Sequence, residues 1–330
     1  MNIPFLRSRR VWLLSFFVLA GPARGLAQNE PEFSGLAPLT NREVRLQLTA
    51  PAGAFCRLDA STNLSAWTAL ATLATNSGAL EYTDSAAPFL EARFYRAEQM
   101  AGTNHLTGDH LVTSTGNVVI HPVYHASLVL SWAGQTIYVD PGDAASRFTG
   151  LPRADLILLT HGHSDHYVAA TVTTVKGSNA VIVAPSVVYS AMPVALRNLT
   201  TVLTNGASTN LLGLAIDAVP AYNLTSTQHP KGQGNGYVLT FGDRRLYVSG
   251  DTEDTPELRA LPDIDVAFLA MNLPYTMTAA KAVSAVREFR PRVVYPYHYR
   301  DQSGAVTNAA AFKQQLGTDL GIEVRLRKWY

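Results

Sequence analysis

Three histidines and one aspartate stand within six consecutive residues of the segment Thr160-His161-Gly162-His163-Ser164-Asp165-His166-Tyr167. Because the whole chain of 330 residues holds only 9 histidines, this density of imidazole and carboxylate groups is far above background. Both groups are common metal ligands. On an extended segment His161 and His163 point the same way, and Asp165 and His166 follow from a turn. The segment therefore predicts a metal site with room for two adjacent ions, and a polar surface loop that binds nothing is the alternative.

A strand and a helix are expected to hold this cluster. The run Asp155-Leu156-Ile157-Leu158-Leu159 is rich in branched apolar side chains and indicates a buried strand. Val168, Val172 and Val175 follow at helical spacing. The cluster is thus predicted on the turn between the carboxyl end of a strand and the start of a helix, where functional side chains are common.

Two metal ions need more than four ligands, and three other residues are candidates. Asp251 follows a strand expected over 245–249, and a carboxylate there can bridge two ions, although an acid in this place often begins a turn or caps a helix. His298 ends a strand expected from residue 292, where a partly buried polar residue is the alternative. His229 lies in a polar loop that could be plain surface.

The composition, with 47% hydrophobic and 15% charged residues, is that of an ordinary globular protein of one large or two modest domains. The formal net charge is +1 and no Lys/Arg-rich run follows residue 10, so we expect no nucleic-acid partner. A small-molecule substrate is expected instead, and the oligomeric state is not indicated. The single cysteine, Cys56, excludes an intrachain disulfide and a cysteine-based zinc site.

Residues 1–27 are predicted to be a signal peptide. Arginines precede an apolar run over 11–20, and small residues follow up to Ala27. Because this run is shorter than the ~20 apolar residues that span a bilayer, we expect cleavage, export to the periplasm or the medium, and no integral membrane association of the mature protein. An uncleaved anchor is the alternative. The paired arginines fit a twin-arginine signal and a plain secretory signal equally.

Residues 32–100 are predicted to form a small all-β sandwich domain, because short alternating stretches are separated by Pro, Gly, Asn and Ser. The segments 58–67, 82–84 and 93–97 resemble an immunoglobulin- or fibronectin-like module. This region contains no histidine, and a passive spacer is favoured over a surface-binding role. The polar residues 101–113 are predicted to be a linker.

Residues 114–330 are predicted to form a layered α/β domain, because strands alternate with helices. Strands are expected over 118–120, 127–132, 136–140, 155–159, 180–184, 215–221, 236–241, 245–249, 264–271, 292–295 and 322–326, and helices over 279–289 and 308–316. Thr278 can cap the first of these helices, and Pro291 stops it.

The order of these motifs resembles the metallo-β-lactamase-fold hydrolase superfamily, in particular its compact UlaG-like branch. The resemblance covers about 118–326 and rests on His161-x-His163-x-Asp165-His166, on Val139-Asp140-Pro141 before it, and on Gly250-Asp251-Thr252 and Pro296-Tyr297-His298 after it. It implies an αβ/βα four-layer sandwich, with two mixed sheets face to face, helices outside and a dinuclear metal site at one edge.

The resemblance also implies a role for each residue. One ion takes His161, His163 and His229, the other takes Asp165, His166 and His298, and Asp251 bridges them. Asp140 matches an acid that orients the ligands without binding metal. Asn223 stands where the family's third motif has a histidine, and an amide oxygen is a weak zinc ligand. We therefore expect His229 to bind the ion and Asn223 to contact a ligand or the substrate.

Two Zn²⁺ ions are the expected cofactor, with Mn²⁺ or Fe²⁺ also compatible with His and Asp ligands. Such ions lower the pKa of a bound water toward ~7 and supply hydroxide for attack on a carbonyl or phosphoryl centre. Asp165 is expected to be a ligand that can also accept a proton. His125, in a His-Ala-Ser segment typical of relatives, is expected to be a proton donor or a structural hydrogen-bond partner. Lys231, Tyr275 and Arg300 could contact an anionic substrate, or could be ordinary surface residues.

The predicted function is that of an exported metal-dependent hydrolase acting on an ester, lactone, amide or phosphodiester bond. A true β-lactamase is less expected, because those enzymes either lack a bridging Asp or have Cys at that position, whereas this chain has Asp251. A nucleic-acid-processing enzyme is also less expected, because the large inserted domain of those relatives is missing. The alternative from another class is a non-catalytic metal-binding or adhesion protein with a degenerate hydrolase scaffold. Asn223 is the one feature that favours it.

Overall fold

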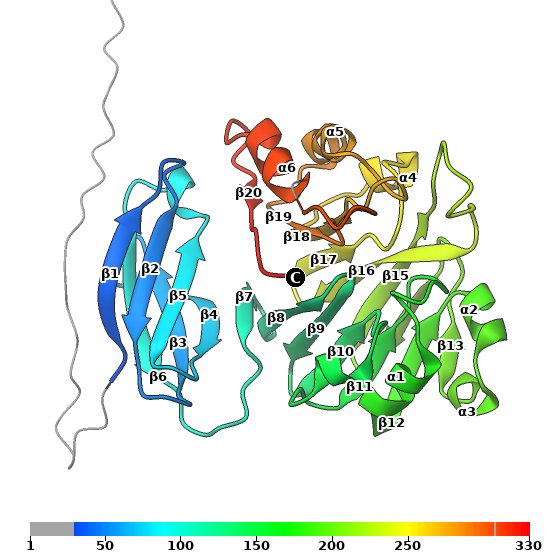
Figure 1. The fold of residues 1–330 in the computed structure, drawn as a ribbon, viewed down its shortest axis with the longest axis horizontal. Helices are drawn as coiled ribbons and strands as arrows, with labels where there is room; N and C mark the ends of the chain where they lie inside the picture. The colour runs from blue at the N-terminus through cyan, green and yellow to red at the C-terminus, as the bar shows by residue number, and fades with distance from the viewer. Residues whose placement is uncertain (1–29, 307) are drawn as a thin grey trace, which may run out of the picture. The chain divides into compact units, whose positions relative to one another are not determined.

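The computed structural model describes residues 30–306 and 308–330 (Figure 1). The chain divides into two compact units, with the boundary between His110 and Leu111. The predicted signal peptide, 1–27, lies outside the described residues. Within the described ranges, no helix combines the length and the apolar character that crossing a membrane requires.

The described part of the first unit consists of β-strands and one 3-10 turn. Its elements are β1 (Glu32–Pro38), β2 (Val44–Thr49), β3 (Phe55–Ser61), β4 (Thr68–Ala74), β5 (Ala79–Asp84), η1 (Ala87–Phe89), β6 (Phe94–Gln99) and β7 (Gly108–Thr113), which continues past the boundary. Strands β1, β2 and β5 form one antiparallel sheet, and β3 pairs antiparallel with both β4 and β6. Leu46, Leu58 and Leu80 pack together from the two sets of strands.

The second half of the predicted linker differs from the expectation. Residues 108–113 form β7, which pairs with β4 through Ala71 and Asp109. The Nε2 atom of His110 lies 2.9 Å from the hydroxyl oxygen of Thr72. Strand pairing with a distant segment supplies the order that the weak periodicity of this sequence does not indicate.

The first sheet of the second unit runs in the order β13-β12-β11-β10-β9-β8. Its strands are β8 (Gly116–Tyr124), β9 (Ser127–Trp132), β10 (Gln135–Val139), β11 (Ala154–Leu158), β12 (Lys176–Ala184) and β13 (Thr200–Val202). Strands β8 to β10 are antiparallel neighbours, and β10 to β13 are parallel. The tight turn between β9 and β10 places Ala133 and Gly134 at positive φ, as a two-residue hairpin turn requires.

The second sheet runs in chain order from β14 to β20. Its strands are β14 (Ser208–Leu211), β15 (Leu214–Ala221), β16 (Gly234–Phe241), β17 (Arg244–Val248), β18 (Val266–Ala270), β19 (Val293–Tyr297) and β20 (Glu323–Val324). Strands β14 to β17 are antiparallel neighbours, and β17 to β20 are parallel. The sequence predicted most of these strands within a few residues and missed the short β14.

Alternating side chains of the second sheet divide between two apolar layers. Val266, Phe268 and Ala270 of β18 belong to a core shared with the strands of the first sheet. Ala267 and Leu269 belong to a second cluster, in which the second sheet packs against helices. A strand that is buried on both faces in this way appears in the sequence as a continuous apolar run.

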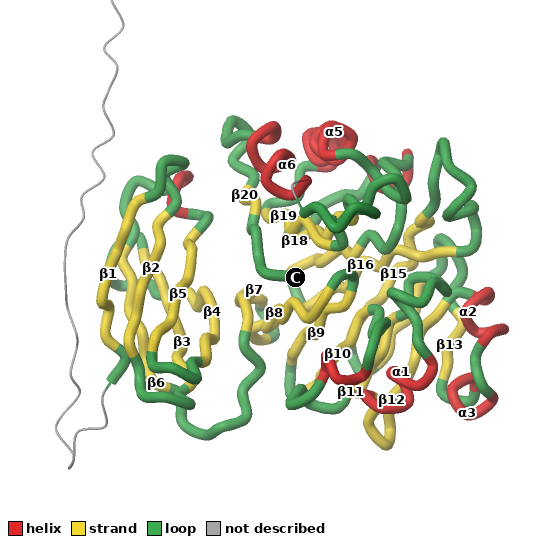
Figure 2. Tube along the Cα trace, viewed as in Figure 1, coloured by secondary structure: helices red, strands yellow, loops and turns green. Residues whose placement is uncertain are grey.

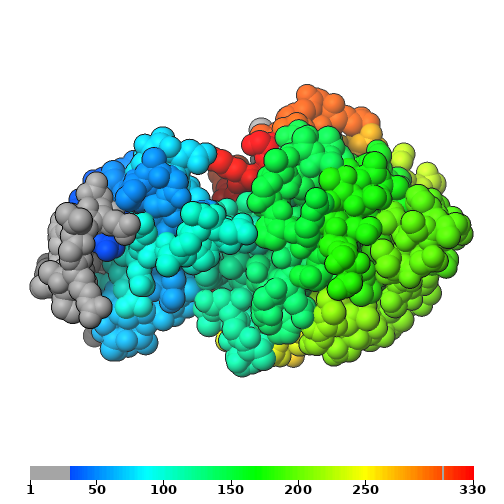
Figure 3. All heavy atoms as spheres, turned by 90° about the horizontal axis from the view of Figure 1, so that it is seen from below, coloured from blue at the N-terminus to red at the C-terminus, as the bar shows by residue number. Residues whose placement is uncertain are grey.

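Helices cover the outer faces of the two sheets (Figure 2). They are α1 (Ala169–Val175), α2 (Ser186–Ala191), α3 (Val194–Arg197), α4 (Pro256–Arg259), α5 (Ala279–Phe289) and α6 (Asn308–Leu316), with a 3-10 turn η2 (Ala145–Phe148). The predicted bounds of α5 and α6 are confirmed, and Thr278 caps α5 by accepting a hydrogen bond from the backbone N–H of Lys281. Figure 3 shows the green part of the chain, which holds α1 to α3, exposed on one face of this unit.

Gly142 is a place where the fold admits no side chain. An added Cβ atom would lie 2.2 Å from the carbonyl oxygen of Asp165 and 2.6 Å from the backbone nitrogen of His166. We expect Gly142→Ala to lower the free energy of unfolding by about 3 kcal/mol, because backbone atoms must shift to make room. Urea unfolding of the metal-free protein measures this change.

Gly162→Ala is the matched control, because it adds the same methyl group inside the histidine segment. The nearest atom to its Cβ position is a side-chain carbon of Val188 at 3.9 Å. We expect a change within about 0.5 kcal/mol. Equal unfolding midpoints for the two variants would contradict the steric explanation.

Candidate metal centre

The cluster of histidines and acids forms where strands of both sheets end. In the first sheet β8, β10 and β11 run in one direction, and in the second sheet β15, β17 and β19 do so. The carboxyl ends of parallel strands meet at one edge of a sheet. The side chains that follow these ends are His125 after β8, Asp140 after β10, His161 to His166 after β11, Asn223 and His229 after β15, Asp251 after β17 and His298 after β19.

Three imidazoles form the first group of possible ligands. His161 Nε2 lies 3.0 Å from His163 Nδ1. The ring of His229 lies 5.1 Å from that of His161 and 5.0 Å from that of His163, between ring centroids. One nitrogen from each of the three rings falls within 4.8 Å of the other two, which is close enough for a single ion.

A second group surrounds His298. Its Nε2 atom lies 3.0 Å from Nε2 of His166 and 3.2 Å from a carboxylate oxygen of Asp165. His125, Asp165 and His298 also satisfy the spacing for a single ion. The resemblance implied that His166, Asp165 and His298 lie together, and the structure also brings His125 to the same point.

Asp251 lies between the two groups. One carboxylate oxygen is 3.3 Å from Nε2 of His166, and the other is 3.3 Å from Nε2 of His229. The carboxylate is buried, with only 4% of the residue exposed. Each oxygen therefore faces a different group of imidazoles, which is the arrangement that a bridging ligand needs.

Asp140 ties the histidine segment to the end of β10. Its carboxylate accepts hydrogen bonds from the backbone N–H of Thr160 at 2.7 Å and from the Thr160 hydroxyl at 2.6 Å. The second oxygen also lies 2.7 Å from Nδ1 of His166. This contact directs the Nε2 atom of His166 toward Asp251 and His298. Asp140 thus orients Thr160 and His166 and does not itself face the centre of the cluster.

Burial and charge act in opposite directions on the ionisable groups of the cluster. Burial is the largest influence on His161 and holds its pKa well below the usual value, so this imidazole is neutral and ready to bind a cation. Burial also lowers the pKa of His166, but the carboxylates of Asp251 and Asp140 outweigh it and raise that pKa well above normal. A metal that binds His166 must therefore displace a proton.

The acids of the cluster remain ionised. Burial raises the pKa of Asp251, but the positive charge of His298 and His166 outweighs it and holds that pKa well below normal. For Asp165, burial is again outweighed, here by hydrogen bonds from His125 and His298, and the pKa is lowered. A carboxylate with a low pKa is a good cation ligand and a weak proton acceptor.

His229 and Asn223 meet at one backbone carbonyl. The side-chain amide of Asn223 donates to the carbonyl oxygen of Tyr275 at 2.7 Å, and Nδ1 of His229 lies 3.1 Å from the same oxygen. The backbone N–H of Asn223 also donates to the carbonyl of His229 at 2.9 Å. Asn223 thus holds the loop that carries His229.

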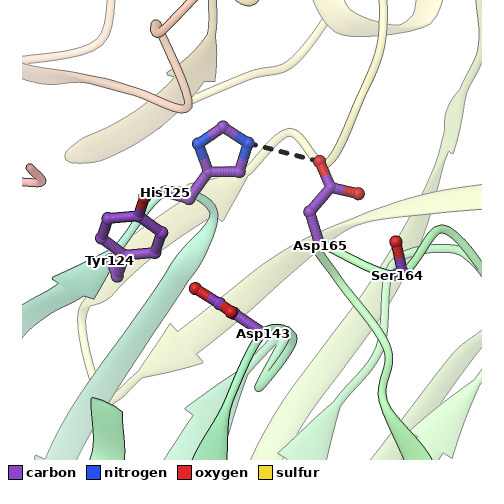
Figure 4. Close-up of a pocket in the computed structure, with 5 residues that line it drawn as sticks. All are labelled: Tyr124, His125, Asp143, Ser164 and Asp165. Carbon is purple, nitrogen blue, oxygen red and sulfur yellow. Dashed lines mark ion pairs between the residues drawn. The ribbon is translucent and has the colours of Figure 1, made fainter. Parts of the chain in front are cut away.

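A cavity of about 250 Å³ opens beside the second group (Figure 4). It is lined by Tyr124, His125, Asp143, Ser164 and Asp165. The figure shows the imidazole of His125 directed at the carboxylate of Asp165, and the two are 3.3 Å apart.

The three residues that the sequence associated with an anionic substrate are held by protein contacts. Lys231 forms an ion pair with Glu257 at 2.7 Å, and Tyr275 accepts a side-chain hydrogen bond from Gln302. Arg300 donates to the hydroxyl of Tyr124 at 3.2 Å. Sequence reasoning missed Tyr330, whose hydroxyl lies 2.8 Å from Nδ1 of His125, because no local pattern marks a contact across 205 residues.

Comparisons with known proteins identify the family of this chain. A family model described as a beta-lactamase superfamily domain matches residues 120–298. A UPF0173 metal-dependent hydrolase of Thermococcus onnurineus is 31% identical over 169 residues, which are 50% of this chain and 75% of that protein. A protein of the same description from Pyrococcus horikoshii is 29% identical over 204 residues, which are 58% of this chain and 89% of that protein.

Solved structures show the same likeness. The crystal structure of a candidate metal-dependent hydrolase from Parabacteroides distasonis has a TM-score of 0.61 and 39% identity, and the match covers 68% of this chain and all of that one. Igni18, a metallo hydrolase from Ignicoccus hospitalis, matches with a TM-score of 0.55 and 22% identity over 64% of this chain and 95% of its own, and shows the shared fold. The chain belongs to the beta-lactamase superfamily, as a metal-dependent hydrolase with the metallo-β-lactamase fold.

Proposed function

We propose that this protein is an exported hydrolase that uses two divalent metal ions, with Zn²⁺ as the first choice, to cleave an ester, lactone, amide or phosphodiester bond in a small molecule. The observation that carries the proposal is the position of Asp251, whose two oxygens face separate groups of imidazoles at 3.3 Å. We also propose, from the order of its motifs, that it belongs to the UlaG-like branch of the superfamily.

The donor atoms fit metal ions. The Nε2 atom of His229 and one oxygen of Asp251 are buried and have no hydrogen-bond partner among the described residues. Two pairs of ring nitrogens, His161 with His163 and His166 with His298, approach to 3.0 Å. Each of these pairs can share an N–H···N hydrogen bond, and a bound cation would take the place of the shared proton. The donors are imidazole and carboxylate, which suit zinc and also manganese or iron.

In this proposal His161, His163 and His229 hold one ion, while His166, Asp165 and His298 hold the other. When bound, the ions would polarise the scissile bond and activate a water near neutral pH. Asp251 would help to hold both ions, because each of its oxygens faces one of the two groups of imidazoles. The cavity beside Asp165 and His125 positions the substrate, and its lining by Tyr124 and Asp143 limits the group that enters.

Export and the first unit are the remaining parts of the proposal. The signal-like pattern over 1–27 supports export, and the β-strand content of 32–99 supports an immunoglobulin- or fibronectin-like spacer. A fractionation that finds the mature protein in the cytoplasm, with residues 1–27 attached, would contradict export. The alternative of a non-catalytic scaffold rests on Asn223 alone, and His229 lies within reach of the first ion.

His163→Ala tests the metal-dependent reaction. His163 is exposed, so its loss should leave the fold intact, while one ion loses a ligand. We expect metal content to fall from two equivalents toward one, and turnover of p-nitrophenyl phosphodiesters and lactones to fall by at least about 100-fold. The control is His105→Ala in the first unit. Two bound ions with no turnover of any substrate in the wild type would favour the scaffold alternative.

His229→Ala and Asn223→Ala test which residue completes the first ion. We expect His229→Ala to lose that ion, because it removes a ligand. Asn223→Ala should weaken binding only by about 10-fold, because it loosens the loop through Tyr275. Metal content after dialysis against a chelator series measures both. If Asn223→Ala lost the first ion and His229→Ala only weakened its binding, the side-chain amide of Asn223 would be the ligand.

Asp140→Asn tests the acid that orients the ligands. The substitution keeps the shape of the side chain and removes the charge that faces His166. We expect metal affinity to fall by about 10- to 100-fold with two ions still bound at saturation. Asp155→Asn is the matched control, because Asp155 accepts a backbone hydrogen bond from Thr136 in the same sheet. Isothermal titration of both variants gives the comparison, and equal affinities would remove Asp140 from the proposal.

A further inference from the structure

His125 is in direct contact with two residues of the second group of proposed ligands, Asp165 and His298. Its Nε2 atom is 3.3 Å from the carboxylate oxygen of Asp165 that also lies 3.2 Å from His298. The rings of His125 and His298 are 3.8 Å apart between centroids. One nitrogen of each ring and one oxygen of Asp165 therefore surround a single point.

We propose that His125 is a direct ligand of the second metal ion, beside Asp165, His166 and His298. This inference rests on the proposed two-ion site and adds a residue to it. It also changes the expected role of His125, because an imidazole nitrogen that binds a metal has no proton to donate. His125 then cannot serve as a proton donor to the leaving group through this nitrogen.

Tyr330 fixes the orientation that such a ligand needs. Its hydroxyl lies 2.8 Å from Nδ1 of His125 and accepts a hydrogen bond from the backbone N–H of Arg300 at 3.2 Å. If Nδ1 carries the proton and donates it to Tyr330, Nε2 is free to bind the ion. Histidine ligands commonly donate their other N–H to a polar partner in this way.

The backbone supports the same placement. His125 and His298 have φ angles of 54° and 46°, which is the left-handed region that non-glycine residues seldom adopt. The two are linked directly, because the N–H of His298 donates to the carbonyl of His125 at 3.2 Å. Such a conformation costs about 1–2 kcal/mol per residue, so the surrounding contacts hold both rings in place against this cost.

The competing arrangement is a hydrogen bond without coordination. In that case Tyr330 donates to Nδ1, and Nε2–H donates to Asp165, so that His125 only positions a carboxylate ligand. Glutamine separates the two arrangements, because its amide N–H can donate to Asp165 while its nitrogen cannot bind a metal.

The experiment compares His125→Ala and His125→Gln with the wild type after reconstitution with Co²⁺. Metal content, competition with a chelator and the visible absorption of the second Co²⁺ are the readouts, and none depends on turnover. We expect the affinity of both variants for the second ion to fall by more than about 100-fold. This threshold separates the two roles, because loss of a hydrogen-bond partner that does not bind the metal usually lowers affinity by at most about 100-fold. The spectrum of the second ion should change, while the first ion is retained and shows that the protein is folded.

Tyr330→Phe adds an independent test, because it removes only the hydroxyl group. We expect a decrease of about 10- to 100-fold in affinity for the second ion. Tyr299→Phe is the matched control, because Tyr299 packs on Tyr330 with ring centroids 5.2 Å apart and its hydroxyl donates to the carbonyl oxygen of Arg327 at 3.4 Å, away from His125. This control should bind both ions as the wild type does.

The outcomes separate the two proposals. If the wild type binds one ion, the proposed two-ion function fails and the second-ion role of His125 fails with it. If the wild type binds two ions and His125→Gln keeps the wild-type affinity and spectrum, the ligand role alone is overturned and His125 is a positioning residue. Two ions with no hydrolysis, together with loss of the second ion in both His125 variants, would uphold the ligand role while the hydrolytic function fails.

Discussion

The buried carboxylate of Asp140 is the interaction on which the histidine segment depends. Asp140 has no exposed surface, and the three hydrogen-bonded contacts of its carboxylate go to Thr160 and His166. A buried charge is tolerated only when polar partners surround it, so the carboxylate selects a conformation of the turn in which those partners are present. That conformation also directs Nε2 of His166 away from Asp140 and into the cluster. The metal centre is therefore oriented from outside, by a residue that precedes the cluster by about 20 positions in the chain.

Thr160 also connects the histidine segment to the second sheet through a hydrogen bond and a close packing contact. Its carbonyl accepts a hydrogen bond from the N–H of Asn235, and a Cβ atom on Gly250 would lie 2.9 Å from the Thr160 Cβ atom. The end of β11 is thus packed against the ends of β16 and β17. Only a glycine fits at position 250, and Asp251 follows it directly. This close approach, in addition to any attraction between charges, sets the separation between Asp251 and the histidine segment.

The sequence predicted the parts of this site that depend on local pattern. The ligand types, the strand before His161 and the bounds of α5 and α6 follow from periodicity and capping, which a short window contains. The short helices α2 to α4 and the strand β7 were not predicted, because their order comes from packing with distant segments. The place of His125 depends on backbone contacts to His298 and a hydroxyl contact from Tyr330, and no spacing in the chain encodes them.

The same distinction explains why the second group of ligands differs from the first. His161 and His163 lie two residues apart on the loop after β11, so a short stretch of sequence brings their nitrogens together, and only His229 of the first group comes from the other sheet. The second group is assembled from the ends of β8, β11 and β19, and its members meet only when both sheets pack. Its backbone also adopts the left-handed region at His125 and His298. Each of these two residues costs about 1–2 kcal/mol in backbone strain, so the geometry of the second group depends on contacts with segments outside the cluster.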